Sequence, residues 1–186
     1  MTLLLLITVG HGTLSQSALA ELLRGAGVTD VVDVRRFPAS RNHPHVNRDA
    51  LAQWLPAEGI GYRWDGRLGG RRRAPADSPD GWWRVPAFRG YASQMRTPEF
   101  IAGMAELLER LTLSRTTVMC SESLWWRCHR RLIADNATLV HGVAVRHLLH
   151  DGRLVEHPVS AGARLVPPAT IVYDLGGSPA GGGPAP

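Results

Sequence analysis

The sequence predicts an α/β fold in which a mainly parallel sheet of roughly five strands is covered by helices on both faces, a Rossmann-like arrangement of three layers. Short apolar runs of strand length alternate along the chain with segments whose apolar residues repeat at helical spacing. Parallel strands need such crossover helices between them. A length of 186 residues suits one domain, and 44% hydrophobic with 20% charged residues excludes a disordered or fibrous chain.

The first strand and the first helix follow one another directly. Leu3–Val9 is a continuous apolar run ended by glycines, as expected of a strand that is buried on both faces. Ser15 can cap a helix whose apolar positions within 19–26 lie on one face. Gly25 and Gly27 end this helix.

Two further strands frame a short second helix. Val28–Val34 is rich in β-branched residues and predicts the second strand. Pro38 prevents the following loop from continuing this strand. Asn47 can cap a short helix that Pro56 closes. Ile60–Trp64 predicts the third strand.

Periodicity then disappears over residues 65–86, which predicts a long functional loop. Apolar residues at helical spacing over 100–111 mark an amphipathic helix. Thr116–Cys120 predicts the fourth strand, a helix follows over about 126–136, and Val143–Leu148 predicts the fifth strand.

The end of the chain has a different composition. Asp151-Gly152 can turn the chain into a short sixth strand. We expect one domain over 1–158 and a Pro/Gly-rich tail over 159–186 that is largely disordered, because eight of the residues in 176–186 are Gly or Pro. Ile171–Tyr173 could still dock on the domain.

Composition also limits the cellular setting and the partners. The run Leu3–Val9 is far shorter than a membrane helix and follows no basic residue, so we expect a cytoplasmic protein without membrane contact. The two cysteines make no disulfide framework. The net charge is +5 and every basic residue is arginine, which suits an anionic small molecule or a nucleic acid as partner. The oligomeric state stays open.

Polar or glycine-containing segments follow the first four predicted strands. These segments are Gly10-His11-Gly12, Asp33-Val34-Arg35-Arg36, Leu68-Gly69-Gly70-Arg71 and Cys120-Ser121-Glu122. Ligands of open parallel sheets bind outside the carboxyl ends of the strands. We therefore expect these segments to form one site.

Cys120 is the leading candidate for a nucleophile. A thiol between a strand end and a helix, near arginines, would have a lowered pKa. The alternative is a small buried residue that fills space. Glu122 could act as an acid or a base, and His11, at a strand-to-helix turn, could act on a bound anion.

A second group of reactive side chains lies in the next predicted helix. Cys128 shares a helix face with Leu132, which favours burial. Cys120, Cys128 and His129 could in principle bind a metal, but their spacing differs from the short C-x(2-4)-C pairs of zinc sites. We therefore predict no metal site and no cofactor.

Two arginine-containing patterns allow more than one interpretation. Asp33 and Arg35 could face the same side of their strand, either as a structural ion pair or as part of a catalytic site. The loop Arg71–Arg84 mixes arginines with Trp82 and Trp83, as surfaces for single-stranded nucleic acids do, although solvated charge is the simpler interpretation.

Several of these motifs together resemble a family catalogued as domain of unknown function 488 (DUF488). The resemblance rests on Gly10-His11-Gly12, Asp33-Val34-Arg35 with Pro38, Ser40 and Arg41, Leu68-Gly69-Gly70-Arg71, Phe88-Arg89-Gly90-Tyr91-Ala92 with Phe100, and Cys120-Ser121-Glu122 with Trp126, Cys128, His129 and Arg130. It spans residues 7 to about 150. It implies an α/β domain with these motifs at one end, and it implies no reaction.

Three functions remain open. The first is a cysteine-dependent transferase or hydrolase acting on an anionic substrate. The standard phosphate loop of cysteine phosphatases is disfavoured, because Trp126 stands where an arginine is usual. The others are a nucleic-acid-binding module that uses residues 71–84 and a cysteine-based metal or redox sensor. The predicted catalytic residues are Cys120, Glu122 and His11, and the predicted substrate-binding residues are Asp33, Arg35, Ser40, Arg41, Gly69, Gly70, Arg71, Tyr91, Trp126, His129 and Arg130.

Overall fold

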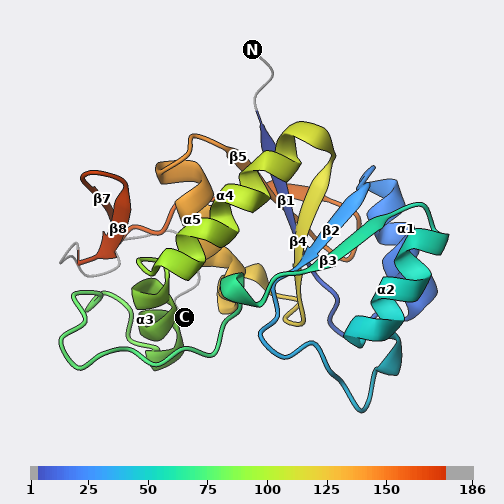
Figure 1. Cartoon of the computed structure of the whole chain (residues 1–186), viewed down its shortest axis with the longest axis horizontal. Helices are drawn as coiled ribbons and strands as arrows, with labels where there is room; N and C mark the ends of the chain where they lie inside the picture. Colours follow the sequence, from blue (N-terminus) through green and yellow to red (C-terminus); the bar gives the residue numbers. More distant parts are fainter. Residues whose placement is uncertain (1–3, 175–186) are drawn as a thin grey trace.

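The computed structural model describes residues 4–174 and confirms a three-layer α/β fold (Figure 1). Its main sheet has six strands in the order β3-β2-β4-β1-β5-β6. The strands are β1 (Leu5–Gly10), β2 (Asp30–Asp33), β3 (Gly61–Trp64), β4 (Thr116–Cys120), β5 (Ala144–Leu148) and β6 (Leu154–Glu156). The first five run parallel, and β6 pairs with β5 antiparallel.

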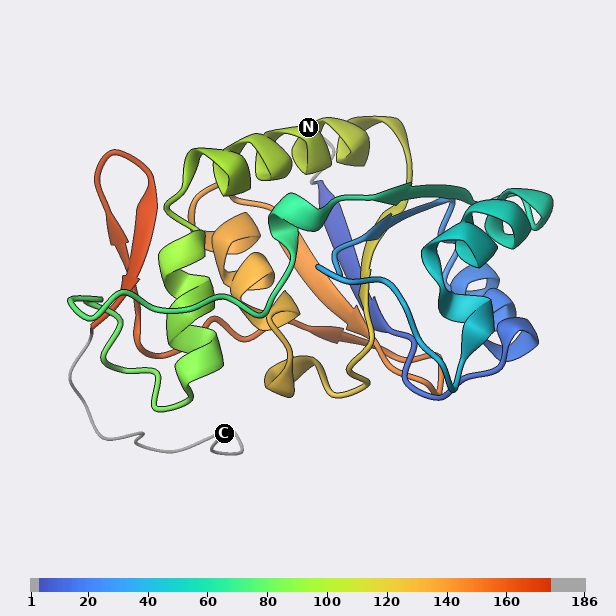
Figure 2. The ribbon, with the colours of Figure 1, turned by 60° about the horizontal axis from the view of Figure 1, so that its bottom comes forward.

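Helices cover both faces of this sheet (Figure 2). They are α1 (Gln16–Gly25), α2 (Arg48–Ala57), α3 (Pro86–Gln94), α4 (Pro98–Leu113) and α5 (Arg130–Leu139). The alternation of side chains along the strands divides the core into two parts. Ile7 and Val31 pack under α1 and α2, whereas Leu6 and Val32 pack under α3, α4 and α5.

The helix boundaries follow the capping residues. The Ser15 hydroxyl accepts a hydrogen bond from Ala18 N, as its position before α1 predicts. Asn47 precedes α2, but its side chain accepts from Ser40 N instead of capping the helix. The helix predicted from about residue 126 begins later, at Arg130, because a separate 3-10 turn, Trp125–Arg127, precedes it. Cys128 and His129 therefore lie in a turn before α5.

We expected residues 159–186 to form a largely disordered tail, but the segment after β6 includes two strands. Strands β7 (Ala163–Val166) and β8 (Thr170–Tyr173) pair as an antiparallel hairpin. Ile171 and Tyr173 are buried in the core shared with α3 and α5, so apolar contact holds the hairpin, in line with the docking expected of this stretch. The glycine- and proline-rich residues from 176 onward lie outside the described residues. No helix within residues 4–174 is both long and apolar enough to span a lipid bilayer.

Candidate functional site

The carboxyl ends of β1, β2 and β4 border a pocket of about 590 Å³, which we call the thiol pocket. It is lined by His11, Gly12, Thr13, Arg35, Arg36, Phe37, Ala39, Ser40, His43, Gly70, Arg71, Ala87, Phe88, Cys120, Ser121, Glu122, Ser123, Arg127, Cys128 and His129. Segments that follow four different strands thus contribute to one pocket.

Adjacent strands bring the segments together. Gly10 of β1 pairs with Cys120 of β4, and the ladder continues past the strands, since His11 N donates to Cys120 O at 2.9 Å. Only glycine fits at position 10, because a Cβ there would lie 1.9 Å from the Glu122 carbonyl oxygen. This close approach sets the imidazole of His11 beside the segment that carries Cys120 and Glu122.

The structure places the predicted site residues in two groups. The residues that line the thiol pocket are His11, Arg35, Ser40, Gly70, Arg71, Cys120, Glu122 and His129. The remaining residues are not among the lining residues and are Asp33, Arg41, Gly69, Tyr91, Trp126 and Arg130.

Asp33 and Tyr91, both of the second group, support the pocket wall from behind. Asp33 is fully buried and pairs with Arg35. Tyr91 is fully buried, donates to Leu68 O at 2.7 Å and has its ring centroid 4.9 Å from that of His129. Their contacts make them positioning residues.

Gly69, Arg41 and Trp126 do not line the pocket, and Trp126 lies in the 3-10 turn Trp125–Arg127 with its ring edge-on to that of Trp125. Gly69 packs against the backbone of Arg36, where a Cβ would lie 2.8 Å from its Cα. Arg41 is exposed and lines a separate shallow hollow near Pro44. The structure therefore gives no contact between Arg41 and the thiol pocket.

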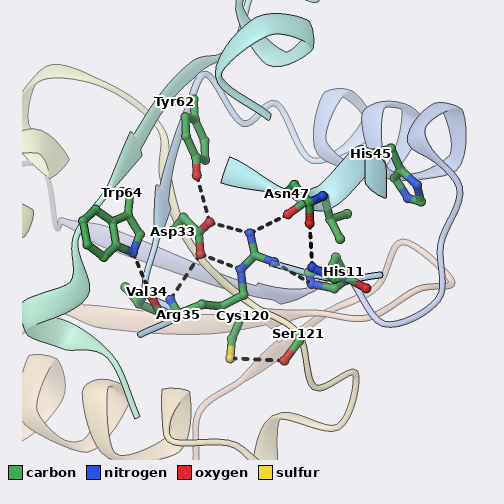
Figure 3. A network of polar contacts seen from close by, with 12 residues as sticks. His11, Asp33, Val34, Arg35, His45, Asn47, Tyr62, Trp64, Cys120 and Ser121 are labelled. Atoms are coloured by element: carbon green, nitrogen blue, oxygen red, sulfur yellow. Dashed lines mark hydrogen bonds and ion pairs between the residues drawn. The ribbon is translucent and has the colours of Figure 1, made fainter. Parts of the chain in front are cut away.

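A buried network joins β2 to the His11 turn (Figure 3). Arg35 donates from Nε to Asp33 Oδ1 at 2.8 Å and from Nη2 to Asp33 Oδ2 at 2.6 Å. Its Nη2 also reaches Val46 O, and Tyr62 donates its hydroxyl to Asp33 Oδ2 at 2.9 Å. Burial opposes the charge of Arg35, but the hydrogen bonds and the charge of Asp33 outweigh it and raise the arginine's pKa.

The same network fixes the His11 ring. Arg35 Nη1 lies 3.3 Å from His11 Nε2, and His11 Nδ1 lies 2.9 Å from Gly12 O. Because a guanidinium only donates and a carbonyl only accepts, Nδ1 carries the proton. Burial, followed by the charge of Arg35, lowers the pKa of His11 to about 4. The imidazole is therefore neutral at neutral pH, and both of its nitrogens are engaged.

Cys120, Cys128 and His129 form a compact group, which we call the Cys-Cys-His cluster. The two sulfur atoms and His129 Nδ1 all lie within 4.8 Å of one another. His129 Nδ1 is 3.8 Å from Cys120 Sγ and 3.7 Å from Cys128 Sγ. No disulfide joins the two cysteines. Cys128 is buried as expected, but it lies in the turn before α5 and not on a helix face, and its thiol is beside Cys120.

The two thiols of the cluster differ electrostatically. The hydrogen bond with Cys128, together with burial, raises the pKa of Cys120. Burial alone would raise the pKa of Cys128 as well, but the hydrogen bond with Cys120 and the charge of Arg130 outweigh burial and lower it. A thiolate is therefore favoured at Cys128, whereas the sequence predicted the lowered pKa at Cys120.

Arg130 holds the back of the cluster. It is 1% exposed, and its Nε donates to Cys128 Sγ at 3.4 Å. Its other nitrogens donate to Thr8 Oγ1 and to the Glu122 carbonyl oxygen. Arg130 thus ties β1, the Glu122 turn and the cluster together, although it was predicted to contact substrate directly.

The exposed part of the pocket carries positive charge. Arg36, Arg71 and Arg127 are exposed pocket residues, and the ion pairs within residues 4–174 involve other arginines. Glu122 is the carboxylate among the lining residues, and its Oε1 accepts from Leu124 N at 3.2 Å. The pocket therefore suits an anion.

The loop over 71–84 does not present its aromatic residues to solvent as a nucleic-acid surface would. Trp83 is fully buried, with its ring centroid 4.8 Å from that of Phe88 and 5.3 Å from that of Tyr173. Trp82 is half-buried against Trp83. The tryptophans pack because the hairpin β7–β8 lies against this loop, where Trp82 N donates to Tyr173 O.

Three pocket residues, Arg36, Arg127 and Cys128, are not among the predicted catalytic or substrate-binding residues, although Arg36 belongs to a segment expected at the site. Arg36 directly follows Arg35, and Arg127 lies seven residues after Cys120. Cys128 was assigned to a helix face because its spacing from Leu132 fits a helix. The closeness of these residues to strand ends in the sequence was a signal that they could line the pocket. It does not show the path of the chain between Glu122 and Arg130.

Comparisons with known proteins identify one family. The family model described as domain of unknown function DUF488 matches residues 15–137. No curated protein and no solved structure matches the chain.

Proposed function

The chain belongs to the DUF488 family, whose description names no reaction, and we propose that it is an enzyme that binds an anionic substrate in the thiol pocket and transfers or hydrolyses a group of that substrate. The observation that carries this proposal is the convergence of exposed arginines and of the Cys-Cys-His cluster on one pocket. Reactive groups beside anion-binding groups, in a concave site at the strand ends, are typical of catalytic centres in α/β proteins.

The arginines supply substrate binding. Arg71 and Arg127 both line the pocket but come from different parts of the chain, since Arg71 follows β3 and Arg127 follows β4. A guanidinium can donate two parallel hydrogen bonds to a phosphate, sulfate or carboxylate group. Arg35 has a different role, because Asp33 already neutralises its charge.

The reacting groups lie at the end of β4 and on the segment that follows it. Cys120 and its cluster form one wall, and Glu122, on the same segment, is the carboxylate placed to move a proton. His11 is a positioning residue, because its nitrogens contact Arg35 and Gly12 O. It holds Arg35 beside the substrate.

The proposal is tested by separating binding from turnover. Arg127→Gln is expected to weaken pyrophosphate binding by about tenfold to a hundredfold, since a charge-assisted hydrogen bond contributes about 1.5–3 kcal/mol. Arg84→Gln is the matched control, because Arg84 is exposed and lies outside the pocket. Isothermal titration calorimetry at low ionic strength measures both. Equal affinities of the two variants would contradict an anion site in this pocket.

Turnover is measured on a panel of chromogenic phosphate, sulfate and glycosyl esters. Cys120→Ala is expected to keep pyrophosphate binding and to lose at least about a hundredfold in rate. Retention of full turnover in this variant would remove the cluster from the reaction. Binding of single-stranded DNA that falls steeply with salt and is lost in Arg84→Gln would instead favour a nucleic-acid module.

A further inference from the structure

We propose that the Cys-Cys-His cluster is a zinc site with three protein ligands and one coordination position open to the thiol pocket. Among residues 4–174 it is the group of three His, Cys, Asp or Glu side chains whose ligand atoms lie close enough to hold one ion. The inference deepens the proposed function and rests on it for the role of the metal. Metal binding itself can be measured without any substrate.

The distances within the cluster match a tetrahedral ion. Zinc binds a thiolate at about 2.3 Å and an imidazole nitrogen at about 2.0–2.1 Å, so sulfur and nitrogen ligands of one ion are about 3.6 Å apart. His129 Nδ1 lies 3.8 Å from Cys120 Sγ and 3.7 Å from Cys128 Sγ. Both sulfur–nitrogen distances are therefore within about 0.2 Å of those expected around one zinc ion.

The orientation of His129 gives an independent reason. His129 Nε2 lies 3.0 Å from Val34 O, and a carbonyl can only accept, so Nε2 carries the proton. The lone pair of Nδ1 is then directed at the two sulfur atoms. Metal-binding histidines commonly donate their other N–H to a carbonyl group in this way, which fixes the ring for the ion.

The charges around the sulfur atoms also suit a divalent cation. Arg130 donates to Cys128 Sγ and is fixed by two further acceptors, so one positive charge stands behind the cluster. Once a bound ion has displaced the protons of both thiols, two thiolates and one guanidinium contribute a net charge of −1, which attracts a divalent cation. Soft thiolates together with imidazole favour Zn²⁺ over Mg²⁺ or Ca²⁺.

The structure leaves room on the pocket side of the cluster. A Cβ at Gly70 would lie 2.9 Å from His129 Nδ1, so the glycine keeps the space beside this nitrogen open. All three ligands line the thiol pocket. Three protein ligands with an open fourth position are typical of catalytic zinc, which binds a water or a substrate oxygen there. The arginines would deliver an anionic oxygen to that position.

The test uses the full chain, reduced and stripped of metal by dialysis against a chelator. Titration with Co²⁺ is expected to give thiolate-to-cobalt charge-transfer absorption that saturates at one ion per chain, and Zn²⁺ is expected to abolish it. Cys128→Ser and His129→Asn should each weaken Co²⁺ binding at least tenfold. Gly70→Ala keeps all three ligands but should also weaken binding, because its Cβ would crowd Nδ1. His141→Asn, distant from the pocket, is the control and should bind as the wild type does.

Circular dichroism and chemical unfolding show whether each variant is folded. The proposal is overturned if the folded wild type gives no charge-transfer band, or if Cys128→Ser keeps it. A Cys120–Cys128 disulfide, seen by mass spectrometry in place of metal binding, would also overturn it and indicate a redox pair. Loss of pyrophosphate binding with cobalt binding intact would contradict the proposed function alone. Pyrophosphate binding without any cobalt binding would contradict the zinc site alone.

Discussion

The thiol pocket and a second hollow lie on either side of Arg36 and Phe37, which line both. We call the second one the edge hollow. It has a volume of about 760 Å³, and its other lining residues are Arg63, Trp64, Asp65, Gly66, Arg67, Arg72, Gln94 and Glu99. Its lining contains neither cysteine nor histidine, whereas the thiol pocket contains both. The two hollows therefore differ in the chemistry of their lining residues.

An Asp-x-Arg pair with the same local geometry lies at each hollow, Asp33 and Arg35 at the thiol pocket and Asp65 and Arg67 at the edge hollow. Arg35 and Arg67 both donate from Nε at 2.8 Å and from Nη2 at 2.6 Å to the aspartate two residues earlier. The pairs differ in exposure, since the side chain of Arg35 is 6% exposed and that of Arg67 is 32% exposed. The motif thus forms a local ion pair in either setting.

The contact made by the remaining nitrogen distinguishes the two pairs. Arg35 Nη1 reaches His11 Nε2, whereas Arg67 Nη1 reaches the carboxylate of Glu106 at 2.9 Å. Only the first contact connects the pair to another strand end and to the thiol pocket. The comparison teaches that convergence of several segments, rather than one sequence motif, identifies the site.

The largest expected effect separates the two pairs by their burial. Asp33→Asn would leave the guanidinium of Arg35 buried without its carboxylate, so it should lower the free energy of unfolding by about 3–5 kcal/mol. Asp65→Asn should lower the free energy of unfolding less, by about 1–2 kcal/mol, because the partly exposed guanidinium of Arg67 can form hydrogen bonds with water instead. Urea unfolding at neutral pH measures both, and equal losses would show that burial does not distinguish the pairs.

A smaller effect concerns pH and a buried histidine on the thiol-pocket side of the sheet. His147 Nδ1 lies 2.7 Å from Thr8 Oγ1, and its Nε2 lies 3.0 Å from His157 Nδ1. Its ring stacks on Trp125 at 4.1 Å. Burial, then the charges of His157 and Arg130, lowers the pKa of His147 to about 2.

The sign of the pH effect follows from this lowered pKa. Between pH 6.5 and 2 the unfolded chain binds a proton at His147 that the folded protein excludes, so stability is complete above pH 6.5 and falls below it. The loss from this residue approaches about 1.4 kcal/mol per pH unit. His147→Gln should remove that contribution, which urea unfolding at pH 7.5, 6 and 5 would detect. If the variant and the wild type lost the same free energy of unfolding on acidification, His147 would not be the source of the pH effect.

The smallest effect is expected at the edge hollow. The Glu106 carboxylate accepts hydrogen bonds from Arg63 and Arg67. All three side chains are partly exposed, that of Glu106 to 41%. Surface ion pairs contribute little because water and salt screen them. Glu106→Gln should leave the urea midpoint within experimental error, and a clear shift would mean that the edge hollow is more rigid than its exposure indicates.

The sequence was most informative where apolar runs were long. Thr116–Cys120 is predicted and observed with the same bounds, and the parallel order follows from the crossover helices. Helix α3 and the hairpin β7–β8 were not predicted as elements. They are short, and their stability depends on shared burial, because Trp83 packs against both Phe88 of α3 and Tyr173 of β8.

The site was predicted in part for a similar reason. His11 and Cys120 directly follow or end buried strands, so their place at the sheet edge follows from topology. Cys128 and Arg127 depend on the turn before α5, whose path is set by Arg130 and its contacts with Thr8 and Glu122. Long-range contacts of this kind have no local pattern in the sequence.

The most direct test of the central claim is a crystal structure of the full chain grown with tungstate, an oxyanion that anomalous scattering locates. The account predicts a tungsten peak in the thiol pocket between Arg71, Arg127 and the Cys-Cys-His cluster. A peak in the edge hollow beside Arg63 and Arg67, with none in the thiol pocket, would contradict it.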